Sequence, residues 1–234
     1  FGRLVFQYGR KALAAAVKPL LLQRLLDAGW QRLVLVDADS IVLTTMAPVF
    51  DVLDDHAIVL CPHRLEPPAE TGPDCSEFRL LQTGTFNGGV LGVRESPPAR
   101  EFLEWWWARL ERFCRHDLEH GLHLDQRWLD LVPGLFGEVG VFRHPGFNVA
   151  YWNLDHRCLD EGPLAPGTNG AGRCHHFHFS GYDPGQPEMV STYAAGLMVR
   201  DTGWAAPIFS DYHQALFDAG QARVSTLPYA FGRF

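Results

Sequence analysis

The sequence predicts an α/β fold in which a mixed, mostly parallel sheet is flanked by helices. Short, continuous apolar runs over residues 33–36, 57–61 and 85–93 are typical of buried strands. Amphipathic stretches with helical spacing alternate with them, most clearly over residues 101–115. Because no internal repeat and no convincing linker interrupts this alternation, we expect a single domain over residues 1–234.

The elements at the start of the chain can be placed individually. Apolar spacing predicts a helix over residues 13–26, which Pro19 should kink or reset and which Asp27-Ala28-Gly29 should end. The run Leu33–Val36 has no polar alternation, and this predicts a strand buried on both faces, as in a parallel sheet. Helices over 125–131 and 209–219, strands over 139–142 and 174–179, and an exposed loop over 162–172 complete the prediction.

Composition argues against several classes of protein. The chain is 47% hydrophobic and 12% aromatic, which argues against disorder. Its net charge is −7 and it has no Lys/Arg run with interleaved aromatics, so we expect no nucleic-acid partner. No apolar run is long enough to predict a transmembrane segment. We expect a cytoplasmic protein, with a peripheral place at the inner face of the membrane as the alternative.

The cysteines indicate a reduced set of thiols. They are odd in number and widely spaced, and they form no C-x-x-C pair. A disulfide framework or a zinc ribbon is therefore disfavoured. The five are Cys61, Cys75, Cys114, Cys158 and Cys174.

The first candidate site is Asp37-Ala38-Asp39, directly after a predicted buried strand. Ligands of open α/β sheets bind outside the carboxyl ends of strands. Two carboxylates at such a position can hold a hard divalent cation such as Mn²⁺ or Mg²⁺, which can bridge the phosphates of an activated sugar. The motif alone is weak, and the alternative is an aspartate that caps the following turn. The preceding strand favours the metal-binding interpretation.

The second candidate lies in Cys174–Gly181, which is rich in histidine. Strand alternation places His176 and His178 on one face and His175 on the other. Buried, hydrogen-bonded histidines are the ordinary interpretation. For His178, which Ser-Gly follows, we favour a metal ligand that acts with the two aspartates. Gly181 would let the backbone approach a phosphate closely.

Two further segments are candidates for binding a sugar. In Phe86–Val90, the amide of Asn87 and the adjacent Gly88 could contact sugar hydroxyls, and a β-bulge or a tight crossing is an equally good interpretation. Asp125 and Gln126 open a predicted helix. Local chemistry alone favours Asp125 as a helix N-cap over a residue that orients a sugar.

The remaining candidates carry less weight. Lys18 and Arg157 could contact phosphate, although solvated surface charges are the usual alternative. Trp105–Trp107 fits core packing better than a sugar platform, because only one face of a helix can be exposed. Pro62-His63 ends a strand and is a minor candidate for lining a cleft.

The order of these motifs resembles the GT-A-fold glycosyltransferases, which transfer sugars from nucleotide-diphospho-sugars. Among these folds it resembles especially the retaining family that includes glycogenin and the bacterial lipopolysaccharide galactosyltransferases. The motifs are Lys18-Pro19, Leu33–Asp39, Phe86–Leu91, Asp125-Gln126 and His178–Gly181. In that family the D-x-D pair and a late histidine bind manganese, an F-N-x-G-V segment contacts the donor sugar, and a D-Q pair lies beside the reaction centre.

The chain resembles more closely a group of bacterial proteins described only as glycosyltransferases, through Pro62-His63, Asn148–Leu154 and His178–Pro184. It departs from the glycogenin-like pattern in having Asp183-Pro184-Gly185 where that family has a Lys-Pro-Trp that grips the diphosphate. The family also begins with strands that bind the nucleobase. We therefore expect the N-terminal strands to be missing and Tyr229–Phe234 to end within a motif.

The resemblance implies metal-dependent transfer of a hexose from a nucleoside diphosphate sugar, most simply a UDP-sugar, with retention of configuration. The acceptor would be a saccharide, a lipid-linked molecule or a protein. The implied metal ligands are Asp37, Asp39 and His178, the residues beside the reacting carbon are Gln126 and Asp125, and the substrate-binding residues are Lys18, Asp37, Asn87, Gly88 and Gly181. A metal-dependent hydrolase or nucleotidyltransferase, and a sugar- or nucleotide-binding module without turnover, are the alternatives.

Overall fold

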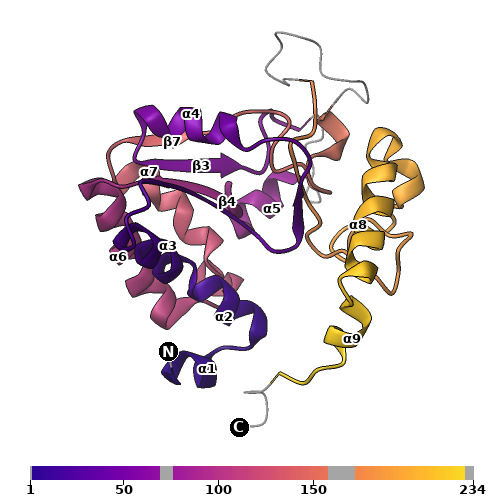
Figure 1. Cartoon of the computed structure of the whole chain (residues 1–234), viewed down its shortest axis with the longest axis horizontal. Coiled ribbons are helices and arrows are strands. Elements are labelled where there is room, and N and C mark those ends of the chain that lie inside the picture. Colours follow the sequence, from indigo (N-terminus) through magenta and orange to yellow (C-terminus); the bar gives the residue numbers. More distant parts are fainter. Residues whose placement is uncertain (1, 69–75, 158–171, 230–234) are drawn as a thin grey trace. The chain divides into compact units, whose positions relative to one another are not determined.

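The computed structural model describes residues 2–68, 76–157 and 172–229 (Figure 1). Within these residues the chain forms two compact units. The first is built from the described parts of 1–37 and 46–143, and the second from those of 38–45 and 144–229. The single catalytic domain over residues 1–234 stays a prediction. Except for Gly172, the loop predicted over 162–172 lies outside the described residues.

The first unit contains a four-stranded sheet, a small hairpin and the helices around them. The strands are β1 (Arg32–Val36), β3 (Ile58–Pro62), β4 (Phe86–Arg94), β5 (His116–Asp117), β6 (Leu122–His123) and β7 (Val139–Val141). The helices are α1 (Gly2–Gln7), α2 (Arg10–Ala16), α3 (Lys18–Asp27), α4 (Ala47–Asp55), α5 (Ser76–Thr83), α6 (Pro97–Phe113) and α7 (Val132–Leu135), with 3₁₀-helices η1 (Leu118–His120) and η2 (Gln126–Leu131).

The sheet confirms the predicted α/β fold with a mixed sheet flanked by helices, and it corrects the predicted strand directions. Its order is β1-β4-β3-β7, with β1 at an edge. The β1–β4 and β3–β4 pairs are antiparallel and only β3–β7 is parallel, so "mostly parallel" was wrong. An apolar run shows that a strand is covered but not in which direction it runs. In Figure 1, α4 lies over one face of this sheet, and α3 and α6 over the other.

The burial of the strands follows their positions in the sheet. The central strand β3 is buried at all five residues, as its apolar run predicts. The edge strand β1 is exposed at both ends and half-buried between them, so the prediction of a strand buried on both faces was wrong. β1 has a hydrogen-bonded neighbour on one side only within this sheet, and this leaves its ends open to solvent.

Local sequence explains why Lys18 begins a helix. Val17 ends α2 and directly precedes α3, whose first turn contains Pro19. Proline is tolerated there because its missing N–H would have no intrahelical partner. The predicted helix over 13–26 is therefore reset, as expected. α3 ends at Asp27, and Gly29 follows with a positive φ of 96°.

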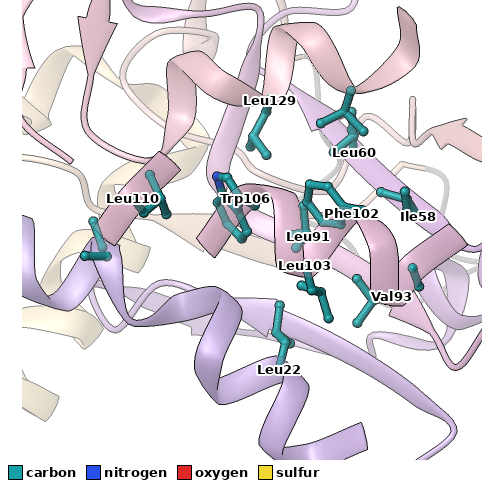
Figure 2. Close-up of a cluster of buried hydrophobic side chains, with 14 of the residues drawn as sticks. Leu22, Ile58, Leu60, Leu91, Val93, Phe102, Leu103, Trp106, Leu110 and Leu129 are labelled. Carbon is teal, nitrogen blue, oxygen red and sulfur yellow. The ribbon is translucent and has the colours of Figure 1, made fainter. Parts of the chain in front are cut away.

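The core of the first unit lies between the sheet and α6. Figure 2 shows Phe102, Leu103 and Trp106 of α6 facing Leu91 and Val93 of β4, together with leucines from α3, β3 and η2. Trp106 is fully buried, and the flanking Trp105 and Trp107 pack against the same core. The tryptophan run is therefore a packing element, as predicted.

The second unit has a two-stranded sheet and an aromatic core. Its elements are β2 (Ser40–Val42), β8 (His176–His178), α8 (Ala206–Asp218), α9 (Gln221–Ser225) and 3₁₀-helices η3 (Leu154–His156), η4 (Val199–Asp201) and η5 (Gly203–Ala205). Phe177 and Phe179 pack against Phe209 and Tyr212 of α8. The rings of Phe179 and Tyr212 stack with centroids 3.7 Å apart. The strand predicted over 174–179 is shorter than expected.

Two sequence predictions can be checked on the described residues. No helix among them combines the length and the apolar character needed to cross a bilayer. Cys61, Cys114 and Cys174 are free thiols, as predicted, and the other two cysteines lie outside the described ranges.

Candidate functional site

The first site feature is a break in the pairing of β3 with β4. Ile58, Val59 and Leu60 pair regularly with Val93, Gly92 and Leu91. Continued pairing would place Pro62 opposite Gly89, but Pro62 pairs with Phe86 instead. Asn87, Gly88 and Gly89 therefore leave the ladder with β3. The backbone carbonyl oxygen and N–H of Gly88 meet side chains instead. The bulge that the glycines predicted is present.

Lys18 holds three oxygens in the first unit. Its Nζ lies 2.7 Å from Asp37 Oδ1, 2.7 Å from Asp125 Oδ2 and 2.9 Å from the carbonyl oxygen of Gly88. An ammonium group has three donors, so all of them are used. The Lys18 side chain is only 13% exposed, and the solvated-surface interpretation was wrong. Burial alone would lower the pKa of Lys18, but Asp125 and Asp37 outweigh burial and raise it.

Asp125 is fixed from two directions. Its side chain is 7% exposed, meets Lys18, and makes no capping hydrogen bond to η2, so the N-cap interpretation was wrong. The indole Nε1 of Trp106 donates to the Asp125 carbonyl oxygen at 3.1 Å. Burial raises the pKa of the Asp125 carboxyl, and the Lys18 ammonium opposes that rise. The helix predicted over 125–131 is the 3₁₀-helix η2 over Gln126–Leu131.

Asn87 and Gln126 bind each other. Asn87 Nδ2 donates to Gln126 Oε1 at 3.1 Å, and the backbone N–H of Gly88 donates to the same oxygen at 3.3 Å. Gln126 Nε2 donates to the Thr83 carbonyl oxygen at 2.8 Å. Asn87 is 5% exposed, so its amide is committed mainly to the protein. Contact of Asn87 and Gly88 with a sugar stays a prediction.

In the second unit, strand pairing brings Asp39 to His178. Ser40 of β2 pairs with His178 of β8, and the backbone N–H of Phe179 donates to the Asp39 carbonyl oxygen at 2.8 Å. Asp39 Oδ1 then lies 3.2 Å from His178 Nε2. His178 is 4% exposed and Asp39 is half exposed, so the pair opens to solvent on the carboxylate side. Alternation along β8 places His176 beside His178, with ring centroids 6.5 Å apart.

Asp37 directly follows β1 and is separated from Asp39 only by Ala38. Its backbone N–H donates to the Gly89 carbonyl oxygen at 3.0 Å. One carboxylate oxygen from Asp37, one from Asp39 and a ring nitrogen of His178 all lie within 4.8 Å of one another. Two carboxylates and an imidazole are donors that suit Mn²⁺, and the carboxylates also suit Mg²⁺.

Other predicted residues have local structural roles. Gly181 has a φ of +75°, and a Cβ there would lie 2.6 Å from Ser191 Oγ, so packing alone requires glycine. Arg157 is 3% exposed and is therefore not a surface charge. Contact of Gly181 or Arg157 with phosphate stays a prediction. Trp152 lies in the segment Asn148–Leu154, and its ring meets the His178 ring edge to face with centroids 5.3 Å apart.

Sequence reasoning missed the backbone acceptors of this site and gave little weight to His63. The carbonyl oxygens of Gly88 and Thr83 hold Lys18 and Gln126, and nothing in the residue types reveals such contacts. The His63 ring lies 3.2 Å from Asn87 Nδ2. The pair of glycines after Asn87 was the available signal, because glycines within strands mark bulges.

Comparison with known proteins gives two distant relatives. No family model matches the chain. "Uncharacterized protein YfnF" of Bacillus subtilis (strain 168) is 26% identical over 178 residues, which cover 71% of this chain and 55% of the relative. "Uncharacterized protein YfnD" of the same strain is 27% identical over 158 residues, which cover 63% and 45%. The chain thus spans about half the length of the curated relatives that it matches.

Solved structures to which the chain is similar include glycosyltransferases. One is involved in the glycosylation of the major capsid of PBCV-1, with a TM-score of 0.44, 12% identity, and coverage of 73% of this chain and 71% of that one. Another is the galactosyltransferase LgtC in complex with donor and acceptor sugar analogs, with a TM-score of 0.40, 16% identity, and coverage of 86% and 64%.

We predict that Lys18→Met lowers the free energy of unfolding by about 3–5 kcal/mol, because it leaves the buried Asp125 carboxylate without its cation. Lys18→Arg should not restore stability, since a planar guanidinium cannot reproduce three donors that diverge from one nitrogen. Denaturant unfolding measures the stability of both variants. Lys11→Met is the control, because Lys11 is exposed. Equal effects of the Lys18 and Lys11 substitutions would contradict the prediction.

Gly88→Ala tests the close packing of the bulge. A Cβ at Gly88 would lie 2.7 Å from Asp125 Oδ2, so the carboxylate must move away from Lys18. We expect a loss of about 1–3 kcal/mol, as for other overpacked sites. A Cβ at the exposed Gly137 meets nothing within 4 Å, and Gly137→Ala should therefore stay within about 0.5 kcal/mol of the wild type in the same unfolding assay.

Proposed function

We propose that this chain is the sugar-transferring part of a divalent-metal-dependent glycosyltransferase that uses a nucleoside diphosphate sugar, most simply a UDP-sugar, as donor. The observation that carries the proposal is the Asp39–His178 pair, formed by residues 139 positions apart, with Asp37 two positions before Asp39. The acceptor would be a saccharide, a lipid-linked molecule or a protein, as the resemblance of the motifs implies.

The residues present fit a divalent cation. Two ligands at right angles on an ion with bonds of about 2.2 Å lie about 3 Å apart. Asp39 Oδ1 and His178 Nε2 are 3.2 Å apart, which supports their binding one ion from adjacent positions. Asp37 supplies a second carboxylate, one oxygen of which already meets Lys18. Asp37 could also contact a ribose hydroxyl.

The local charge also supports a cation. Asp37, Asp39 and Asp125 carry three negative charges when ionised, and Lys18 neutralises one of them. The chain has Asp183-Pro184-Gly185 where the resembling family has a diphosphate-binding Lys-Pro-Trp. A bound Mn²⁺ or Mg²⁺ would offset this charge and stabilise the diphosphate leaving group. The carboxylates and His178 would hold the cation in place.

The sugar would lie against Asp125 and Gln126. Lys18 holds the Asp125 carboxylate, and Asn87 with the Gly88 N–H holds the Gln126 carbonyl oxygen. Gln126 Nε2 donates one hydrogen to Thr83, and among the described residues nothing accepts its second hydrogen. That hydrogen is suited to a sugar or acceptor oxygen beside the anomeric carbon, where groups preorganised by the protein stabilise charge that develops in the transition state. Retention of configuration belongs to the same proposal.

The direct test is release of nucleoside diphosphate from a panel of nucleotide sugars with and without Mn²⁺, together with Mn²⁺ binding measured by electron paramagnetic resonance. We expect Mn²⁺-dependent release, and at least about tenfold weaker Mn²⁺ binding in Asp39→Asn and His178→Gln. Asp155→Asn is a matched control, because Asp155 meets His156 at 3.0 Å elsewhere in the second unit. Binding of metal and nucleotide sugar without release would favour a binding module, and hydrolysis without transfer would favour a hydrolase.

Gln126→Ala should lower kcat by at least about tenfold and change the donor KM far less, because its proposed contact strengthens in the transition state. Asp39→Asn should affect both constants, since the cation also binds the ground-state diphosphate. Initial rates over a range of donor concentrations separate the two constants. Unchanged kcat in Gln126→Ala would remove Gln126 from the reaction centre.

A further inference from the structure

His63 follows β3 directly and is 5% exposed. Its backbone N–H donates to the Thr85 carbonyl oxygen at 3.0 Å, and its ring Nδ1 lies 3.0 Å from the same oxygen. A carbonyl oxygen can only accept, so Nδ1 must carry the proton. In this neutral tautomer the other ring nitrogen, Nε2, is an acceptor.

The acceptor nitrogen of His63 faces Asn87. His63 Nε2 lies 3.2 Å from Asn87 Nδ2. The orientation of the Asn87 amide is fixed, because Asn87 Oδ1 accepts the backbone N–H of Gly89 at 2.9 Å. The Asn87 Nδ2 group therefore points its two hydrogens at His63 and at Gln126.

The amide of Gln126 is oriented in the same way. Its Nε2 must donate to the Thr83 carbonyl oxygen, which leaves Oε1 to accept from Asn87 and from the Gly88 N–H. A path of hydrogen bonds thus runs from the Thr85 carbonyl oxygen through the side chains of His63, Asn87 and Gln126 to the Thr83 carbonyl oxygen. Backbone groups along this path determine which side-chain atom donates and which accepts at each step. Reversal of any one amide would place two donors or two acceptors face to face.

We propose that His63 is a positioning residue that fixes the Gln126 amide through Asn87. This proposal rests on the proposed function, in which Gln126 lies beside the reacting carbon. His63 acts on Gln126 by accepting the Asn87 hydrogen bond, and substrate contact is assigned to Gln126.

The physical need for such a residue follows from the Asn87 side chain. The last torsion of asparagine is broad, so sterics alone do not fix the amide plane. Asn87 is 5% exposed, and water therefore cannot readily replace a lost acceptor. An amide that rotates to find another partner withdraws its hydrogen from Gln126 Oε1. A displacement of about 1 Å at a reaction centre can reduce the rate about a hundredfold.

Two substitutions of similar size test the two ring nitrogens separately, because each can replace the hydrogen bond of only one of them. The end of a glutamine side chain reaches the position of Nε2, so His63→Gln can accept the Asn87 hydrogen bond with its carbonyl oxygen. The amide of an asparagine reaches only the position of Nδ1, so His63→Asn can donate to Thr85 but leaves Asn87 without its acceptor. Each variant keeps the backbone hydrogen bond to Thr85.

With a turned-over nucleotide sugar, His63→Asn should lower kcat about 10- to 100-fold and change the donor KM by less than about threefold. His63→Gln should keep kcat within about threefold of the wild type. Equal losses of kcat in both variants, or a loss in KM alone, would overturn the proposal and leave His63 with a merely structural role. Thermal unfolding of both variants reports whether they are folded.

A second readout does not need activity. The side-chain amide of Gln126 gives a ¹⁵N–¹H resonance that is identified by its loss in Gln126→Ala. We expect His63→Asn to shift this resonance and His63→Gln to leave it near its wild-type position. If His63→Asn does not fold, His63→Leu replaces it, since an aliphatic side chain cannot accept the Asn87 hydrogen bond. An unmoved Gln126 resonance in the folded variant would overturn the proposal. A shifted resonance in a protein that releases no nucleoside diphosphate would instead refute the proposed function alone.

Discussion

The first unit depends on one geometric constraint, a mismatch in length between two paired strands. Between the pair Leu60–Leu91 and the pair Pro62–Phe86, β4 has three more residues than β3. The excess takes Asn87, Gly88 and Gly89 out of the ladder with β3. The released backbone groups of Gly88 meet site residues, since its carbonyl oxygen accepts from Lys18 and its N–H donates to Gln126. The Gly89 carbonyl oxygen accepts from the Asp37 backbone and continues the β1–β4 ladder. A bulge that would otherwise weaken a sheet therefore organises charged and amide side chains along one strand.

Lys18 and the β2–β8 pairing have different structural roles. Lys18 places a positive charge against the buried Asp125 carboxyl, where an unpaired carboxylate would be costly. The pairing of Ser40 with His178 joins segments far apart in the chain, and it brings an imidazole to Asp39 without any help from sequence neighbours. Asp37 has a part in both arrangements, because it meets Lys18 and is bonded through Ala38 to Asp39.

Sequence alone predicted the elements and the proximity of Asp37, Asp39 and His178 better than it predicted orientations. Periodicity located β3, α6 and the reset at Pro19, because burial and the missing proline N–H act locally. The direction of β1 and its edge position depend on long-range pairing, which an apolar run does not encode. The role of Asp125 depended on meeting Lys18, 107 residues earlier in the chain, and so local chemistry alone favoured a helix cap.

The released backbone groups of β4 have a consequence for mutational mapping. Replacement of side chains along this strand leaves the Gly88 and Gly89 carbonyls in place, so a scan would report the strain of an added methyl group and not the value of those acceptors. Evolution faces the same limit, because no codon change removes a main-chain oxygen. The hydrogen bonds accepted by these carbonyl oxygens cannot be removed by mutation. Chemical synthesis can weaken them one at a time, through replacement of a backbone amide by an ester.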